Sequence, residues 1–150
     1  MSDLIYLDYN CFQRGFDDQR QVRIRMEAAA CEEVFAKTEE GAVRLVWSFM
    51  HEDECALCPF PERALEALNL SALCAVRVGP TEEIRGAALS FQQAAPLSAR
   101  DAVHVACACA ARANVLLTCD DDLLRRAPRA APHLTVMNPV DYVRSKQGEW

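Results

Sequence analysis

The sequence has few glycines, almost no lysine and no long apolar segment. Its five glycines, at positions 15, 41, 79, 86 and 148, form neither a G-x-G-x-x-G nor a G-K-[ST] phosphate-binding loop, which argues against the common nucleotide-binding folds. No stretch approaches the ~20 consecutive apolar residues of a membrane-spanning helix. The N-terminal residues MSDLIYLDYN have no basic segment followed by an apolar run, as a secretion signal would. We therefore expect a cytoplasmic protein that does not enter a membrane.

Positive charge is also scarce. The chain has 16 basic and 22 acidic residues, a net charge of −6, and its only lysines are Lys37 and Lys146. This balance argues against a protein that binds nucleic acid by general electrostatic attraction. It is compatible with a nuclease, because an acidic metal site itself contributes negative charge. The eight cysteines, in a chain without a secretion signal, are expected to be reduced thiols.

What the sequence does contain is a regular alternation of strand-like and helical segments. Its 150 residues are a typical length for one domain, which we expect to span residues 1–150. The apolar patterns predict strands at about 3–9, 43–47, 73–78, 115–118 and 134–137, and helices at 18–40, 48–58, 61–70, 81–94, 98–113, 121–127 and 138–145. Strands alternating with helices predict an α/β fold, a three-layer α/β/α arrangement with a mostly parallel central sheet.

Four acidic residues stand where apolar residues would be expected. Asp8 ends the strand LIYLD and Asp120 ends VLLTCD, and the carboxyl ends of parallel strands meet at the edge of a sheet where sites form. Glu54 lies on an apolar face of its predicted helix, and Asp101 opens a helix that is apolar almost all round.

Grouping carboxylates in a low dielectric is costly, since each one raises the pKa of the next. A divalent cation removes this cost, and Mg²⁺ and Mn²⁺ prefer carboxylates and water as ligands. Each acid also has an ordinary explanation: Asp8 as a turn residue, Asp101 as the first-turn partner of Ser98, Glu54 as a solvated helix residue and Asp120 as a helix N-cap. The joint pattern favours a magnesium site, and such sites usually act on phosphates.

Four segments in order, LIYLDYNCF, WSFMHEDE, LSARDAVHVACA and VLLTCDDDLLRRA followed by NPVDYV, resemble the PIN-domain family, whose bacterial members include VapC-like toxins of toxin–antitoxin pairs. The resemblance implies a ribonuclease that depends on Mg²⁺ or Mn²⁺. It places the catalytic acids at Asp8, Glu54, Asp101 and Asp120. Asp8, Asp101 and Asp120 would hold the metal, and Glu54 would complete the site or orient the attacking water. Asn10 and Thr118 match the small polar residues that hold such acids.

Some assignments around these acids stay open. Glu52 is an alternative to Glu54, but the two are ~200° apart around a helix and cannot share one site. Asp122 is a further candidate for the metal site. Three arginines that follow Asp120 in the sequence are candidates for phosphate contacts, although a solvated basic helix face is the somewhat better explanation: Arg125, Arg126 and Arg129.

A toxin role implies RNA as substrate, a cognate antitoxin protein as partner, and a homodimer. The alternatives are a non-catalytic PIN-fold module that binds RNA or protein and, less favoured, a haloacid-dehalogenase-like phosphatase, which needs an aspartate where this chain has Asn10. A zinc site at His51, Cys55 and Cys58 is less favoured than a packed helix face. His104 is expected to be a partly buried helix residue rather than a base.

Overall fold

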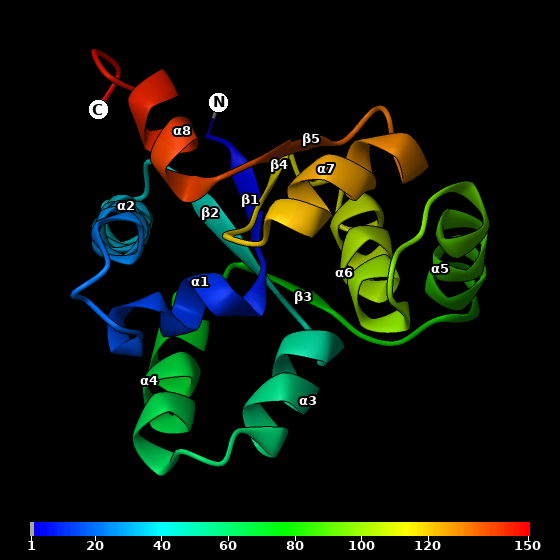
Figure 1. Cartoon of the computed structure of the whole chain (residues 1–150), viewed down its shortest axis with the longest axis horizontal. Helices are drawn as coiled ribbons and strands as arrows, with labels where there is room; N and C mark the ends of the chain where they lie inside the picture. The colour runs from blue at the N-terminus through cyan, green and yellow to red at the C-terminus, as the bar shows by residue number, and fades with distance from the viewer. Residues whose placement is uncertain (1) are drawn as a thin grey trace.

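A computed structural model describes residues 2–150 and contains one five-stranded sheet (Figure 1). The strands are β1 (Leu4–Leu7), β2 (Arg44–Ser48), β3 (Val76–Val78), β4 (Val115–Leu117) and β5 (Thr135–Met137), in the spatial order β3-β2-β1-β4-β5. Every neighbouring pair is parallel, which confirms the predicted sheet type. β3 is shorter than the predicted strand 73–78 because residues 72–74 form hydrogen-bonded turns after the preceding helix.

Helices cover both faces of this sheet, so the predicted three-layer α/β/α architecture is confirmed (Figure 1). One face carries α1 (Tyr9–Gln13), α2 (Val22–Glu39), α4 (Pro61–Ser71) and α8 (Pro139–Ser145). The other carries α5 (Glu82–Ala94), α6 (Ala99–Ala110) and α7 (Asp121–Ala130). α3 (Phe49–Leu57) follows β2 directly, and a 3₁₀ turn, η1 (Arg14–Phe16), follows α1.

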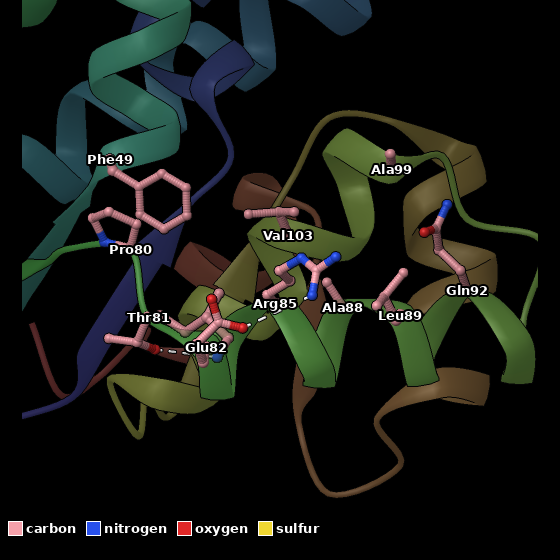
Figure 2. Close-up of a pocket in the computed structure, with 11 residues that line it drawn as sticks. Phe49, Pro80, Thr81, Glu82, Arg85, Ala88, Leu89, Gln92, Ala99 and Val103 are labelled. Carbon is pink, nitrogen blue, oxygen red and sulfur yellow. Dashed lines mark hydrogen bonds and ion pairs between the residues drawn. The ribbon is translucent and has the colours of Figure 1, made fainter.

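On the second face, a groove of about 550 Å³ runs between α5 and the start of α6 (Figure 2). Thr81 caps α5 at the mouth of this groove by accepting the N–H of Ile84 at 3.2 Å. Phe49, Leu89 and Val103 give the groove an apolar lining. None of the four predicted acids lines it, so it is separate from the candidate active site.

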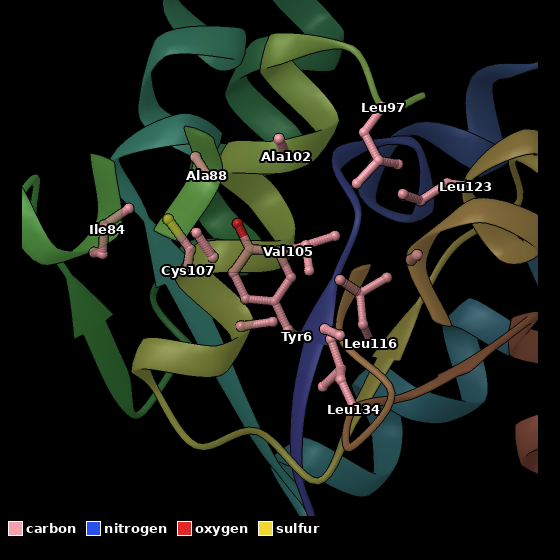
Figure 3. Close-up of a cluster of buried hydrophobic side chains, with 14 of the residues drawn as sticks. Tyr6, Ile84, Ala88, Leu97, Ala102, Val105, Cys107, Leu116, Leu123 and Leu134 are labelled. Carbon is pink, nitrogen blue, oxygen red and sulfur yellow. The ribbon is translucent and has the colours of Figure 1, made fainter. Parts of the chain in front are cut away.

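The alternation of side chains along each strand divides the core in two. Leu4 and Tyr6 of β1 point toward α5, α6 and α7, whereas Ile5 and Leu7 point toward the opposite helices. Figure 3 shows Tyr6 surrounded by side chains of α6 and β4. All of these strand residues are at most 5% exposed, as expected for a parallel sheet covered on both faces.

Two short neighbouring elements, α1 and η1, were not predicted, and α1 lies beside the candidate site. α1 begins at Tyr9, one residue after Asp8, and is five residues long. A helix this short does not complete two turns, so it leaves no apolar period in the sequence. Within residues 2–150, no helix combines the length and the apolar character that a bilayer crossing requires.

Candidate active site

Asp8 lies at the carboxyl end of β1 and is held there by two neighbours. β1 and β4 pair with Leu7 beside Leu117, so Asp8 comes next to Thr118. The Thr118 hydroxyl donates to Asp8 Oδ2 at 2.7 Å, and Asn10 Nδ2 donates to the same oxygen at 3.1 Å. Asp8 is only 4% exposed and Thr118 is fully buried. Asn10 and Thr118 therefore hold Asp8 as the family resemblance implied.

Asp120 follows β4 and caps α7. Its Oδ1 accepts the backbone N–H groups of Asp122 at 2.8 Å and Leu123 at 3.4 Å. The ordinary N-cap role weighed for this residue is thus present. Both hydrogen bonds use Oδ1, which leaves Oδ2 for another ligand. The Asp120 N–H also donates to Thr118 Oγ1 at 3.0 Å, so one threonine ties the positions of Asp8 and Asp120 together.

Asp101 lies in the first turn of α6, where its N–H donates to Ser98 Oγ at 3.1 Å. Burial raises the pKa of its carboxyl group, and the negative charges of Asp8 and Asp120 raise it further. Arg100 and His104 act in the opposite direction without cancelling this effect. The structure therefore brings Asp8, Asp101 and Asp120 close enough together for their charges to repel.

The three aspartates offer the chemistry that a hard divalent cation needs. Asp8 Oδ1 and Asp120 Oδ2 accept no hydrogen bond from residues 2–150. The charges of these two aspartates raise the pKa of the third, Asp101. In the same range, no three His, Cys, Asp or Glu side chains are close enough to hold one ion directly. Mg²⁺ typically binds through one or two carboxylates and keeps several waters, so this donor set fits Mg²⁺ or Mn²⁺.

Glu54 and Glu52 occupy different surroundings on α3. Glu54 is 12% exposed in its side chain, accepts a hydrogen bond from His104 Nε2 of α6, and lies 3.8 Å from Arg100 Nε. Glu52 is exposed and accepts the Trp47 indole N–H at 2.7 Å. The acid that faces α6, the helix that carries Asp101, is therefore Glu54.

Two of the three predicted phosphate contacts on α7 have other partners. Arg125 pairs with Asp122, the further metal-site candidate, and both are exposed. Arg126 donates to the carbonyl oxygen of Pro96 at 3.2 Å, and Arg129 is exposed near the far end of the helix. The cation beside the acids is Arg100, which is 61% exposed and adjoins both Glu54 and Asp101.

A second groove, of about 510 Å³, begins at Glu54. It lies between α1, α3 and α4. Its walls include the apolar or aromatic side chains of Tyr9, Met50, Leu57 and Phe60 and the basic side chains of Arg63 and Arg100. Phe60 is 57% exposed, and the Arg63 guanidinium lies 5.2 Å from its ring centroid. An exposed aromatic ring with neighbouring arginines is a surface on which nucleic-acid bases and phosphates can bind.

Two histidines that the sequence pattern assigned only to packing lie behind Glu54. His104 is fully buried, not partly buried as expected, because α6 is enclosed between the sheet, α3 and α5. His51 is also fully buried and stacks on Trp47 at 5.0 Å between ring centroids. Its ring nitrogens bond to Leu7 O and to Ser48, which agrees with a packed helix face rather than with zinc binding.

Comparison with protein-family models gives no match to this chain, and comparison with curated proteins gives none either.

Proposed function

We propose that this protein is a Mg²⁺- or Mn²⁺-dependent ribonuclease of the PIN type, with Asp8, Asp101 and Asp120 as metal-binding acids. The observation that supports it is the effect of the Asp8 and Asp120 charges on Asp101 near the carboxyl edge of a parallel sheet, with one oxygen of Asp8 and one of Asp120 accepting no hydrogen bond from residues 2–150. The sequence resemblance to PIN domains points to RNA as the substrate.

Each residue then has a defined task in phosphodiester hydrolysis. A bound divalent cation supplies an activated water at neutral pH and neutralises charge on the phosphate. Thr118 and Asn10 keep Asp8 oriented through its Oδ2. Glu54, which contacts His104 Nε2, orients the attacking water and accepts its proton. Arg100 offers positive charge to the flanking phosphate.

The substrate strand has a place to lie next to these acids. The groove that contains Glu54 presents Phe60 for base stacking and Arg100 for phosphates, whereas Arg63 is paired with Asp17 at 3.2 Å. It accommodates an extended single strand better than a duplex, because bases must be unstacked from their partners before they can stack on a protein ring. We therefore propose single-stranded RNA as the substrate form.

We propose further, on the resemblance to VapC-like toxins, that the protein acts in the cytoplasm as a homodimeric toxin with a cognate antitoxin. Growth arrest on expression, relieved by the product of a neighbouring gene, is the expected result. Harmless high-level expression of the active enzyme would instead indicate a housekeeping nuclease.

The nuclease proposal predicts that the purified protein cleaves single-stranded RNA when Mg²⁺ or Mn²⁺ is supplied. Chelation by EDTA should abolish cleavage, and excess Mn²⁺ should restore it, because the three aspartates cannot replace the charge that the cation contributes. Cleavage is measured on a labelled single-stranded RNA, with a duplex of the same sequence as control. Binding of RNA without any cleavage, with either metal, would instead support a non-catalytic PIN-fold module.

A further inference from the structure

A continuous chain of hydrogen bonds runs from the backbone of β1 to Glu54. His51 Nε2 contacts Leu7 O at 2.6 Å, and His51 Nδ1 contacts the Ser48 N–H at 2.9 Å. The Ser48 hydroxyl lies 2.8 Å from the Tyr6 hydroxyl, which lies 2.6 Å from His104 Nδ1. His104 Nε2 then contacts Glu54 Oε1. The four side chains behind Glu54 are at most 1% exposed.

The β1 end of this chain fixes the protonation of His51. A backbone carbonyl only accepts, so His51 Nε2 carries the proton that Leu7 O receives. Burial, reinforced by nearby His104, lowers the pKa of His51 to about 3, so the ring is neutral. Its Nδ1 is therefore an acceptor, and the Ser48 N–H donates to it. The Ser48 hydroxyl lies 3.1 Å from the same nitrogen and 2.8 Å from the Tyr6 hydroxyl, so the shorter contact of this hydroxyl is with Tyr6.

The Glu54 end of the chain indicates the same direction of hydrogen-bond donation, from Ser48 toward Glu54. The oxygens of a carboxylate only accept, so in this contact His104 Nε2 is the donor. With the proton on Nε2, Nδ1 accepts, and the donor within reach is the Tyr6 hydroxyl. Tyr6 is fully buried, so its hydroxyl has only these protein partners. Tyr6 in turn accepts from Ser48. Every donor in the chain has an acceptor.

The position of His104 connects this chain to the metal-binding acids. His104 and Asp101 are three residues apart on α6, so they lie on neighbouring parts of one helix face. Asp101 adjoins Asp8 and Asp120, and His104 adjoins Glu54 of α3. α6 thus connects Glu54, through His104, to the position of Asp101. Without the hydrogen bond, the glutamate side chain could adopt several rotamers, which would disperse its carboxylate.

We propose that His104 is a positioning residue for Glu54, held by Tyr6 and Ser48 with its proton on Nε2. This inference rests on the proposed nuclease function for its effect on catalysis, whereas the proton location can be measured without any activity. His104 touches neither substrate nor metal in this arrangement. It fixes the direction of the Glu54 carboxylate, and Tyr6 fixes His104.

The proton location is tested by NMR on the intact wild-type protein with ¹⁵N-labelled histidine. We expect both His104 and His51 to show the neutral Nε2–H form, with a downfield His104 Nε2–H proton that shifts in Glu54→Gln and stays in Glu52→Gln. An Nδ1–H form of His104, an imidazolium, or equal responses to the two substitutions would overturn the proposal. These outcomes are readable even when the protein cleaves no RNA.

The positioning role is tested by kinetics on three variants. His104→Leu should lower kcat ~10–100-fold with little change in KM, as is typical when an orienting partner is removed. His104→Gln, whose amide can still donate to Glu54, should recover part of kcat. Tyr6→Phe, which removes only the hydroxyl behind His104, should lower kcat less than His104→Leu does. The control is His133→Leu, an exposed histidine remote from Glu54.

Thermal unfolding of the same variants separates positioning from a structural role. A merely structural histidine would give equal losses of kcat in His104→Leu and His104→Gln, in proportion to their losses of Tm, and this result would overturn the proposal. Unchanged kcat in a folded His104→Leu would do the same. If both His104 variants fail to fold, the kcat of Tyr6→Phe provides the test. An unchanged kcat in Tyr6→Phe would contradict the proposed chain of hydrogen bonds.

Discussion

Asp8→Asn is expected to lower the rate of RNA cleavage at least ~10³-fold while leaving the protein folded. Metal-assisted stabilisation of the transition state contributes several kcal/mol, and each ~1.4 kcal/mol corresponds to a factor of ten in rate. Asparagine keeps the size of Asp8 and can still accept the Thr118 hydroxyl proton through its amide oxygen. It removes the charge that a cation needs. The measurement is the initial rate of cleavage of a single-stranded RNA in Mn²⁺, with near-UV circular dichroism to verify the fold.

Asp141→Asn is the matched control for this substitution. Asp141 is exposed on α8 and makes the same change of charge, but it lines neither the groove at Glu54 nor the aspartate cluster. Its cleavage rate should stay within about twofold of the wild type, since surface substitutions of this kind change energies by ~0.5 kcal/mol or less. Undiminished cleavage by Asp8→Asn would rule out the proposed site, even in a protein that is a nuclease.

The largest expected loss of stability comes from Glu27→Gln. Glu27 is 1% exposed on α2, and it accepts hydrogen bonds from Arg14 Nη2 at 2.8 Å, Arg23 Nε at 3.3 Å and Asn138 Nδ2 at 2.6 Å. Removing one member of a buried ion pair typically costs ~3–5 kcal/mol. We expect about 3 kcal/mol at pH 7, near the lower end of that range, because Arg14 and Arg23 keep some contact with water. The melting temperature should fall by roughly 6–12 °C.

The pH dependence of this loss identifies its cause. Burial alone would raise the pKa of Glu27, but the hydrogen bonds and charges of Arg14, Asn138 and Arg23 lower it overall. A carboxyl group with a lowered folded-state pKa stabilises the protein above its unfolded pKa of ~4.3, and this contribution is lost as the pH falls through the folded-state pKa. The difference in unfolding free energy between wild type and Glu27→Gln should therefore shrink below about pH 4.

Glu32→Gln is the control, because Glu32 is exposed on the same helix. Its unfolding free energy should match that of the wild type within ~0.5 kcal/mol. A Glu27→Gln protein as stable as this control at pH 7 would mean that the desolvation of Glu27 cancels the strength of its hydrogen bonds.

The sequence alone was sufficient to predict the sheet type, most helices and the meeting of Asp8 with Asp120. These follow from local patterns and from one topological rule, that parallel strands end at a common edge. β1 and β4 are direct neighbours, so Asp8 and Thr118 had to be adjacent. Of the two glutamates weighed on α3, Glu54 contacts His104 of α6 and Glu52 contacts Trp47.

What the sequence could not show depends on contacts between distant segments. The pairing of Glu54 with His104 joins residues 50 positions apart and depends on how α3 packs against α6. The burial of Glu27 depends on Asn138, 111 positions away. Arg126 was a candidate for phosphate binding because of its type and neighbourhood, but its orientation toward Pro96 comes from the packing of α7. The spacing of apolar residues within one helix or strand does not predict these contacts between distant segments.

The central claim is that Asp8, Asp101 and Asp120 are assembled to bind a divalent cation. The raised pKa of Asp101 means that its ionised form disfavours the folded state at neutral pH. Asp101→Asn should therefore melt above the wild type without metal, because the substitution removes this repulsion. Mn²⁺ should raise the melting temperature of the wild type, since the ion binds only the folded protein.

The most direct test is to measure the melting temperatures of wild type and Asp101→Asn during titration with Mn²⁺ up to millimolar concentration. We predict a large rise for the wild type and little or none for Asp101→Asn, so that the order of stability of the two proteins reverses as metal is added. A wild type that does not respond, or a variant that responds as strongly as the wild type, would contradict the proposed metal site.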